Sequence, residues 1–554
     1  MAKIYDASLF PTKLDLLTDW MGRQRWYASS STTPQLRRLG GYRLDDPEGE
    51  VGMETLVVAD ESGPDPVVYQ VPLTYRAAPL TGAERALIGT IEHSVLGTRY
   101  VYDAPHDPVY TAQLLLLLCG QEEAQHASLS ATPEPKVIGR PLDPVDVRRA
   151  TASRVLAGEQ SNTSIVIDTT GPAGAPASQV ICKVFRVLQH GENPDVELQT
   201  ALARAGSDLV PAPLGSVHGV WGDPVVEGAE ASGPLAFASE FLPGTQDAWR
   251  TFLVAARRGE DFTERARALG EATASIHTAL AGALEVQQAR ESDREALARS
   301  FHARVLAAVG EQGELSDALE TIRAIEAAGV DADWPPLQRV HGDYHLGQVL
   351  DVPGRGWVVL DFEGEPLRPM NERLAPDLAL RDVAGMLRSF DYVAGTLAQE
   401  ASERDSSSDT GDTGDADDAP TPPTAEEARA WAKAVREAFL DGYAATGPDP
   451  RAPEAAALLA ALELDKALYE VTYESRNRPT WVPIPVQAVR VLCSETPTPA
   501  STARRSVTEV SDQSPTTQAS TTGSDEDQTT PATAEEANAP STAVEEVDAD
   551  GQAP

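Results

Sequence analysis

The sequence predicts an α+β protein in which a strand-rich first half is followed by a helical second half. Strand-like runs separated by Gly, Pro and Asp turns dominate up to about residue 240, and amphipathic helical patterns dominate from residue 247 onward. Two acidic stretches have no apolar periodicity, so they cannot bury enough apolar surface to fold. We therefore expect an acidic disordered insertion at 403–424 and a disordered acidic tail at 495–554.

The strand-rich half divides into two units. Residues 1–95 start with an amphipathic helical stretch and continue as strand-like runs, which predicts a small α+β module. Residues 96–240 contain a helix ending in LLLLLCG and then three strand-like runs that predict a small antiparallel sheet. Residues 241–494 carry long helical patterns interrupted by two short motifs. The predicted order is a small module, a strand-rich lobe and a helical lobe.

Charge and composition exclude several classes of function. The 554-residue chain has a formal net charge of −40 and no basic stripe, so nucleic acids and anionic membranes are not expected partners. No apolar run approaches the roughly 20 residues that a membrane-spanning helix needs. The three cysteines lack the spacing of metal ligands, which excludes a disulfide framework and a zinc site. We therefore expect a cytoplasmic protein.

The two motifs in the helical lobe carry the strongest chemical signal. In HGDYHLGQVL (341–350), Asp343 precedes an amide side chain, Gln348, and the following VVLDFEGEP places Asp361 at the end of a strand. A phosphoryl acceptor needs a carboxylate base, whereas Mg²⁺ bound to ATP needs hard oxygen ligands. We therefore predict Asp343 as the base, Gln348 and Asp361 as metal ligands, and Glu363 as either a further ligand or a solvent-facing side chain. His341 is expected to brace the loop.

The strand-rich lobe contains the features expected of an ATP site. Lys183 lies inside the apolar strand VICKVF, where a solubilising charge is poorly explained in a chain with six lysines, so it is predicted to bind phosphates. Glu197 on the following helix is its expected partner, with Glu192 and Asp195 as alternatives. The turn GEQSNTS and the segment SEFLPG are expected to contact the phosphates and adenine. The predicted contacts in these two segments are Gln160, Ser161, Asn162, Thr163, Ser164, Glu240, Phe241 and Leu242.

The last long helical pattern, LDKALYEVTYESRN, is predicted to supply the acceptor site. Polar and aromatic residues recur on one of its faces, and sugars are bound by planar polar side chains together with aromatic rings. A solvent-exposed face is the alternative interpretation of this pattern. The predicted acceptor residues are Lys466, Tyr469, Glu470 and Tyr473 on this helix, with Tyr344, His345 and Arg381 near the catalytic motif.

These motifs resemble those of a known family. GEQSNTS, VICKVF, HGDYHLGQVL and VVLDFEGEPLRP resemble the aminoglycoside-phosphotransferase-like branch of the eukaryotic-type kinase fold. The last two, with QRWYA at 24–28 and YESRNRPTWVPIP at 473–485, resemble the actinobacterial maltokinase family. The resemblance covers about residues 1–494 and implies a bilobal kinase-like fold with an N-terminal cap domain. It also implies ATP-dependent phosphorylation of maltose to maltose 1-phosphate, feeding glycogen synthesis, with trehalose synthase as a partner.

Two other functions stay open. A kinase of the same fold could phosphorylate an aminoglycoside or another small alcohol, and an acidic acceptor cleft would favour an aminoglycoside because aminoglycosides are polycations. A non-catalytic scaffold of kinase fold is the other alternative. The presence of Asp343, Gln348, Asp361 and Lys183 argues against a scaffold.

Overall fold

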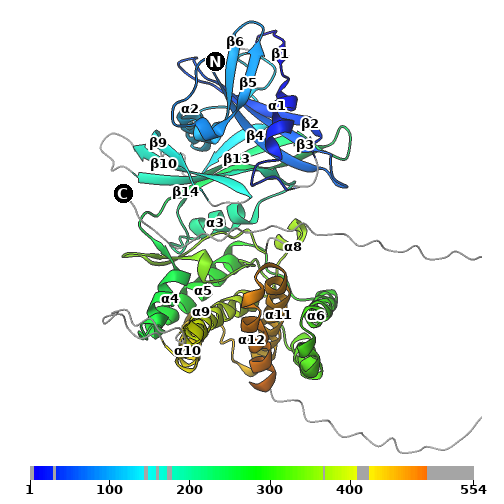
Figure 1. Ribbon diagram of the computed structural model, residues 1–554, viewed down its shortest axis with the longest axis vertical. Helices are drawn as coiled ribbons and strands as arrows, with labels where there is room; N and C mark the ends of the chain where they lie inside the picture. Colours follow the sequence, from blue (N-terminus) through cyan, green and yellow to red (C-terminus); the bar gives the residue numbers. More distant parts are fainter. Residues whose placement is uncertain are drawn as a thin grey trace, which may run out of the picture.

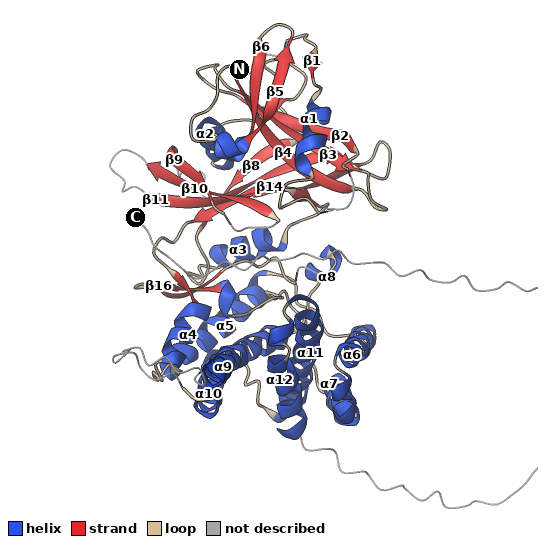
Figure 2. Ribbon diagram, in the orientation of Figure 1, coloured by secondary structure: helices blue, strands red, loops and turns tan. Residues whose placement is uncertain are grey.

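The computed structural model describes residues 5–28, 33–142, 148–157, 161–170, 178–365, 368–407 and 423–495. In this part of the chain, strands gather in one lobe and long helices in the other, and α3 lies between the two (Figure 1). Figure 2 shows the same division by secondary structure. The predicted α+β order of a strand-rich half followed by a helical half is confirmed. Within the described residues, no helix combines the length and the apolar character required of a transmembrane segment.

The first domain is built on an antiparallel sheet of eight strands. Its helix α1 (Lys13–Met21) begins at a capping box in which Thr12 and Asp15 exchange hydrogen bonds. Leu17 and Met21 of that helix are fully buried against the sheet. The sheet contains β1 (Leu9–Phe10), β2 (Leu36–Leu44), β3 (Gly52–Asp60), β4 (Val67–Arg76), β5 (Leu87–His93), β6 (Gly97–Asp103), β7 (Gln125–His126) and β12 (Val187–Leu188). Because β6 pairs with β4 and β5, this sheet continues past residue 95, the boundary expected from the sequence.

The second sheet has six strands in the order β8-β13-β14-β11-β10-β9. The three strands predicted from the sequence are β9 (Arg149–Val155), β10 (Asn162–Thr170) and β11 (Ser178–Phe185). The others are β8 (Val137–Pro141), β13 (Pro213–Gly222) and β14 (Glu230–Glu240). The leucine-rich helix α2 (Pro108–Leu118) packs against both sheets, which explains why it is apolar on nearly all sides. Helix α3 (Pro194–Arg204) lies between β12 and β13 in the chain and contacts both β13 of this sheet and α5 of the helical lobe.

The helical lobe has one large core and a small three-stranded sheet. Helices α5 and α10 approach closely because Gly270 and Gly442 face the opposing backbone: a Cβ on Gly270 would lie 2.0 Å from the carbonyl oxygen of Phe439. The helices are α4 (Ala248–Arg257), α5 (Thr263–Ala283), α6 (Glu291–Glu311), α7 (Leu319–Val330), α8 (Met370–Arg373), α9 (Leu380–Ser407), α10 (Ala425–Thr446), α11 (Pro453–Asn477) and α12 (Pro483–Glu495). The small sheet contains β15 (Gln246–Asp247), β16 (Val349–Val352) and β17 (Gly356–Val359).

The two predicted disordered segments are only partly covered by the structure. Helix α9 runs to Ser407, so the first residues of the predicted insertion 403–424 continue a helix instead. Helix α10 begins after the N-cap Thr424. The rest of the insertion and the tail from residue 496 lie outside the described residues.

Candidate active site

The loop 341–348 carries Asp343 and is fixed by a buried carboxylate. Asp382, on the first turn of α9, accepts hydrogen bonds from the backbone N–H groups of His341 (2.8 Å) and Gly342 (2.9 Å). Burial alone would raise the pKa of Asp382, but the hydrogen bond and charge of His277 hold it below its usual value. His341 Nε2 lies 2.8 Å from the carbonyl oxygen of Leu360, so the loop is tied to the strand end before Asp361. This is the bracing role predicted for His341.

Asp343 faces a lysine of the last long helix. Its Oδ1 lies 3.3 Å from Nζ of Lys466 on α11. Burial acts to raise the pKa of Asp343, but Lys466 and the two neighbouring histidines lower it, so the carboxylate is ionised at neutral pH. The pKa of Lys466 is raised because its carboxylate neighbours outweigh its burial. An ionised carboxylate held in this way can orient an acceptor hydroxyl and take its proton.

Lys183 lies at the centre of a second cluster of carboxylates. Its Nζ is 3.1 Å from Asp195 Oδ2, 3.4 Å from Asp361 Oδ1 and 3.0 Å from Glu363 Oε1. Burial alone would lower the pKa of Lys183, but these carboxylates raise it well above its usual value. One ammonium group therefore faces three carboxylates, and Arg373 donates a hydrogen bond to the backbone oxygen of Glu363 at 3.2 Å.

This cluster has the donor set that a divalent cation needs. Carboxylate oxygens of Asp195, Asp361 and Glu363 lie within 4.8 Å of one another, and hard oxygen donors suit Mg²⁺. Gln348 donates its side-chain N–H to Asp361 Oδ2 at 3.2 Å, which leaves its amide oxygen without a protein partner in the described part of the chain. The pKa of Glu363 is raised by burial and by the nearby carboxylates, against the effect of Lys183, as expected where negative charge is in excess. These residues fit a divalent metal.

The backbone at Asp361 is unusual. This residue has φ of 60°, a left-handed conformation that is rare for residues other than glycine and costs on the order of 1 kcal/mol. The conformation is held from both sides, because His341 binds the carbonyl oxygen of Leu360 and Asp195 accepts the N–H of Phe362 at 2.9 Å. It turns the carboxylate of Asp361 toward Lys183 and Gln348.

The predicted pairing of Lys183 with Glu197 is corrected by the structure. Helix α3 begins at the cap Asn193, so that Asp195 in its first turn faces Lys183. Glu197 is two residues further along the helix, which turns its side chain about 200° around the helix axis from that of Asp195. It therefore points away from Lys183 and pairs with Arg339. Asp195, one of the two alternatives, makes the contact.

The segments predicted to bind the nucleotide are only partly in the expected positions. Gln160 lies outside the described residues, and Ser161, the first described residue after it, is exposed. The side chain of Asn162 donates to Glu363 at 3.2 Å, and Ser164 is paired with Lys183 across β10 and β11. Thr163 points to the other face, where its hydroxyl accepts a hydrogen bond from Arg186. Its predicted role as a phosphate contact is therefore corrected.

The segment predicted to contact adenine is tied into the protein. The backbone N–H of Phe241 donates to the carbonyl oxygen of Gln179 at 3.0 Å. The carboxylate of Glu240 accepts a hydrogen bond from Arg355 at 2.8 Å, and the carbonyl oxygen of Leu242 accepts one from Thr245. The N–H of Phe241 is therefore not available to hydrogen-bond adenine. The contact of the other groups of this segment with adenine stays a prediction.

The predicted acceptor residues divide into two groups. Lys466 lies beside Asp343, and the ring of Tyr469 stacks on Tyr473 with centroids 6.2 Å apart. Tyr473 is 40% exposed, and Arg478 lies over its ring, 5.7 Å from the centroid, while Lys466 lies over the ring of Tyr469 at 5.1 Å. Glu470 is buried and accepts two hydrogen bonds from Arg388. These four residues share a face of α11, as predicted.

The other predicted acceptor residues are used within the protein. Tyr344 belongs to the core of the helical lobe, and its hydroxyl pairs with Thr273 at 3.0 Å, which corrects its predicted role as an acceptor contact. His345 Nδ1 accepts the N–H of Gly347, so this side chain caps the turn that follows Asp343. Arg381 is ion-paired with Asp377 at 2.7 Å and with a second carboxylate at 3.5 Å.

A network of charges beside Lys466 was not predicted. Glu365 accepts a hydrogen bond from Arg368 at 3.0 Å, and Arg304 bridges Glu365 and Asp465. These side chains come from α6, α11 and the segment after β17, so no local spacing signals their proximity. Glu365 and Arg368 lie within VVLDFEGEPLRP and Asp465 lies within LDKALYEVTYESRN, but Arg304, which bridges Glu365 and Asp465, lies outside the motifs that the sequence singled out.

The N-terminal domain contacts the strand that carries Lys183. Arg186 is fully buried, forms two hydrogen bonds with Asp103 (2.8 and 2.7 Å), and lies 4.9 Å from the ring of Trp26. Trp26 belongs to the QRWYA motif, and Arg25 of the same motif contacts the carbonyl oxygen of Leu156 at 3.5 Å. The first domain thus supports both β11 and the strand end that precedes the predicted nucleotide turn.

Comparisons with known proteins give consistent matches. Residues 154–453 match the model described as "Phosphotransferase enzyme family", and residues 20–107 match "Maltokinase N-terminal cap domain". A glucosamine kinase of Streptacidiphilus jiangxiensis is 31% identical over 356 residues, covering 60% of this chain and 72% of that protein. A glucosamine kinase of Mycolicibacterium smegmatis is 29% identical over 355 residues, covering 62% of this chain and 82% of that protein.

Solved structures share the fold. A structure of glucosamine kinase in complex with glucosamine, ADP and inorganic phosphate is 23% identical, with a TM-score of 0.56, covering 87% of this chain and 99% of that chain. A second crystal form of glucosamine kinase gives a TM-score of 0.58 at 24% identity. The predicted bilobal kinase-like fold with an N-terminal cap is confirmed.

Proposed function

The chain belongs to the phosphotransferase enzyme family, and from this premise we propose that it transfers a phosphoryl group from ATP to a hydroxyl group of a sugar. The observation that carries the proposal is the arrangement of two charged centres around one loop. His341 Nε2 lies 2.8 Å from the carbonyl oxygen of Leu360, and this contact joins the loop of Asp343 to the segment in which Asp361 faces Lys183.

The residues have distinct roles in this mechanism. Asp343 orients the acceptor hydroxyl and takes its proton, and the ion pair with Lys466 keeps it ionised. Lys183 binds phosphate oxygens and is oriented by Asp195. Asp361, Glu363 and Gln348 would hold Mg²⁺, which supplies charge neutralisation for the phosphates when it is bound. Asn162 links Glu363 to the start of β10 and so positions that carboxylate.

The charges on the acceptor side favour a sugar over a polycation. Glu365 and Glu470 are each neutralised by an arginine, and Asp465 is neutralised by Arg304. Among the described residues, these ion pairs leave no excess of negative charge on the acceptor side for an aminoglycoside, whose several ammonium groups need one. The stacked tyrosines on α11 add aromatic surface beside Lys466 against which a sugar can pack.

Glucosamine is the first acceptor that we propose. Support comes from the two relatives above, both glucosamine kinases, one of them 31% identical over 72% of its length. An amino sugar carries one positive charge, and Asp343, which pairs with Lys466 and with no arginine of the described residues, is the carboxylate that can face it.

Maltose, phosphorylated at its anomeric oxygen, is the second candidate. It is favoured by the match of residues 20–107 to the maltokinase cap and by the resemblance of the catalytic motifs. The cap alone does not discriminate, because the glucosamine kinase fold covers 87% of this chain, more than the residues after 107 can account for. Trehalose synthase as a partner stays a prediction.

The test is an ADP-release assay with the full chain and a matched set of acceptors. Glucosamine and N-acetylglucosamine differ in one positive charge, and glucose and maltose differ in size, so the order of kcat/KM identifies which feature is recognised. We expect glucosamine to exceed glucose and N-acetylglucosamine by about tenfold or more, since an unpaired buried group costs about 1–3 kcal/mol. Preference for maltose, with phosphate on the anomeric carbon by NMR, would replace the first candidate. Failure of every sugar, or activity that survives Asp343→Asn, would overturn the proposal.

A further inference from the structure

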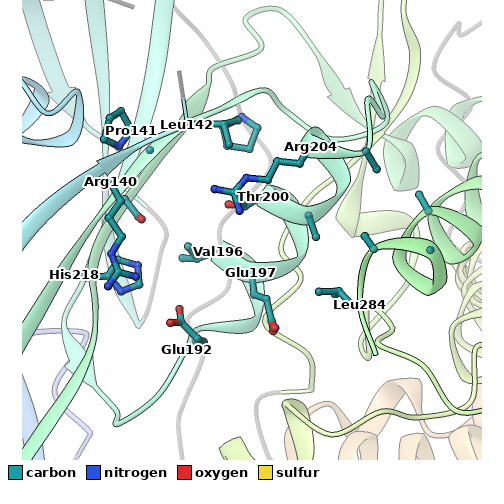
Figure 3. Close-up of a pocket in the computed structure, with 18 residues that line it drawn as sticks. Arg140, Pro141, Leu142, Glu192, Val196, Glu197, Thr200, Arg204, His218 and Leu284 are labelled. Carbon is teal, nitrogen blue, oxygen red and sulfur yellow. The ribbon is translucent and has the colours of Figure 1, made fainter. Parts of the chain in front are cut away.

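A cavity of about 830 Å³ lies on the outer face of α3, the face turned away from Lys183 (Figure 3). Its walls come from β8 and β13 on one side, α3 in the middle and the end of α5 on the other. The face of α3 that carries Asp195 is not part of it. The volume lies within the range of small-molecule sites, which is roughly 300–1,000 Å³. The catalytic groups described above do not line this cavity, so it is separate from the active site.

Two arginines give the cavity its chemistry. Arg140 at the end of β8 and Arg204 in the last turn of α3 approach it from two different walls (Figure 3). Neither guanidinium forms a hydrogen bond or an ion pair with any residue of the described ranges. Guanidinium groups bind phosphate oxygens in pairs of parallel hydrogen bonds, more strongly than they bind neutral acceptors. Two of them in one cavity, unpartnered, suit a phosphate group.

The other polar groups of the lining suit the hydroxyl groups of a sugar. Thr200 and Ser216 contribute hydroxyls, and Glu192 contributes a carboxylate that accepts hydrogen bonds. His218 is buried beside Arg140, and burial together with that charge lowers its pKa to about 4, so its ring is neutral at pH 7 and adds donor or acceptor capacity without charge. Leu142 and Leu284 supply apolar wall.

The charge of the cavity is opposite to that of the whole chain. Glu197 also lines the cavity, but its carboxylate is neutralised by Arg339. The two unpaired arginines therefore outweigh the one remaining carboxylate, Glu192, in a chain whose net charge is −40. A cavity of positive charge on such an acidic protein selects for an anion.

The cavity is linked through α3 to the cluster around Lys183 and through Glu197 to the chain that leads to Asp343. Asp195 on the inner face of α3 orients Lys183, so the position of this helix sets the position of the lysine that binds phosphate. Arg339, the partner of Glu197, lies four residues before Asp343 on the chain that leads into the catalytic loop. A ligand that contacts α3 and β8 together would fix α3 against the sheet and hold the Lys183–Asp195 pair in place.

We propose that this cavity is a regulatory site for a phosphorylated sugar, whose phosphate is bound by Arg140 and Arg204 and whose hydroxyls contact Thr200, Ser216 and Glu192. Binding couples to catalysis because it bridges β8 and α3, which favours the arrangement in which Asp195 orients Lys183. The expected effect is a lower KM for ATP. A phosphorylated sugar is the same class of compound as the product proposed above, but the binding itself is independent of which acceptor the enzyme uses.

The test measures binding and kinetics on the full chain. Glucose 6-phosphate is titrated calorimetrically into protein saturated with a non-hydrolysable ATP analogue, with glucose and inorganic phosphate as comparison ligands. We expect glucose 6-phosphate to bind, inorganic phosphate to bind at least tenfold more weakly, and glucose not to bind. The double variant Arg140→Ala/Arg204→Ala should weaken binding tenfold or more while leaving kcat without effector unchanged.

A matched control separates the site from general charge effects. Arg85→Ala/Arg429→Ala removes two exposed arginines that have no partner in the described ranges and do not line the cavity. It should bind glucose 6-phosphate like the unmodified protein and keep a threefold or greater fall in KM for ATP. The proposal is overturned if glucose 6-phosphate does not bind, if it binds equally to both double variants, if it competes with the acceptor sugar, or if KM for ATP rises or does not change.

Discussion

Each lobe places one lysine among carboxylates, and the two surroundings differ in charge. Lys183 touches three carboxylates directly, and Arg373 donates to the backbone oxygen of Glu363. Lys466 touches Asp343 alone, because Glu365 and Glu470 are taken up by arginines. The first centre keeps negative charge in excess and is suited to recruit a metal with its nucleotide. The charges of the second centre balance, so Asp343 is the carboxylate that remains to orient the acceptor hydroxyl and take its proton.

The largest expected effect comes from removing the carboxylate of Asp343 in the second centre. Asp343→Asn keeps the shape of the side chain but loses its ability to accept a proton, so kcat should fall about 10²- to 10⁴-fold. Affinity for ATP should stay within about twofold, since Asp343 is not in contact with Lys183. Steady-state kinetics and nucleotide titration measure the two quantities. Native kcat in this variant would remove Asp343 from the mechanism.

The metal centre gives the second effect. Asp361→Asn removes one of the carboxylates around Lys183 and should lower activity about 10²- to 10³-fold, with a higher Mg²⁺ concentration needed for half-maximal rate. Asp351→Asn is the control, because Asp351 lies on the neighbouring strand β16 and pairs with Arg265. A Mg²⁺ titration of both variants separates the outcomes. An unchanged Mg²⁺ dependence in Asp361→Asn would contradict the assignment of the metal to this cluster.

The local motifs explain which parts of these centres could be predicted. Lys183, Asp343, Gln348 and Asp361 each lie in a short segment whose residue types and spacing already point to phosphoryl transfer. The side to which each residue of a helix or loop points could not be predicted from these local motifs. One residue separates Asp343, which faces Lys466, from Tyr344, which is buried in the core. Asp195 and Glu197 differ by two positions on α3 and have different partners.

The rest depends on contacts between distant segments. The arginines that neutralise Glu365 and Glu470 come from other parts of the chain, so the charge balance of the second centre has no local signature. The fold class was predictable because strand and helix periodicity separate cleanly near residue 240. Strands β13 and β14 were not anticipated, because most of their residues are buried and their sequences lack a regular alternation of polar and apolar residues, with three glycines in β13 and a Gly-Pro pair in β14.

The pairing on α3 gives a matched test of the corrected prediction. Asp195→Asn leaves Lys183 without the partner that orients it from the helix, so KM for ATP should rise about 10- to 100-fold, as for other positioning residues. Glu197→Gln breaks the pair with Arg339 and should destabilise the fold by about 1–3 kcal/mol while changing KM for ATP less than about twofold. Kinetics and thermal unfolding of both variants distinguish these results. The opposite pattern would restore Glu197 as the partner of Lys183.

The smallest effect concerns the pH dependence of the balanced centre. Burial alone would raise the pKa of Asp343, and Lys466 is the largest of the influences that lower it. Because only the ionised carboxylate accepts a proton, kcat should fall as pH drops through the pKa of Asp343, and that pKa lies below its usual value in the unmodified enzyme. Lys466→Met removes the ammonium group but keeps most of the apolar stem, so the pKa of Asp343 should rise and the acidic limb of the kcat profile should move to higher pH.

At pH 8 the variant should retain kcat within about tenfold, since the carboxylate is ionised there. Lys433→Met, on the exposed face of α10, is the matched control and should leave the profile unchanged. If Lys466→Met lowers kcat equally at every pH, the lysine acts by binding the acceptor and not by keeping Asp343 ionised.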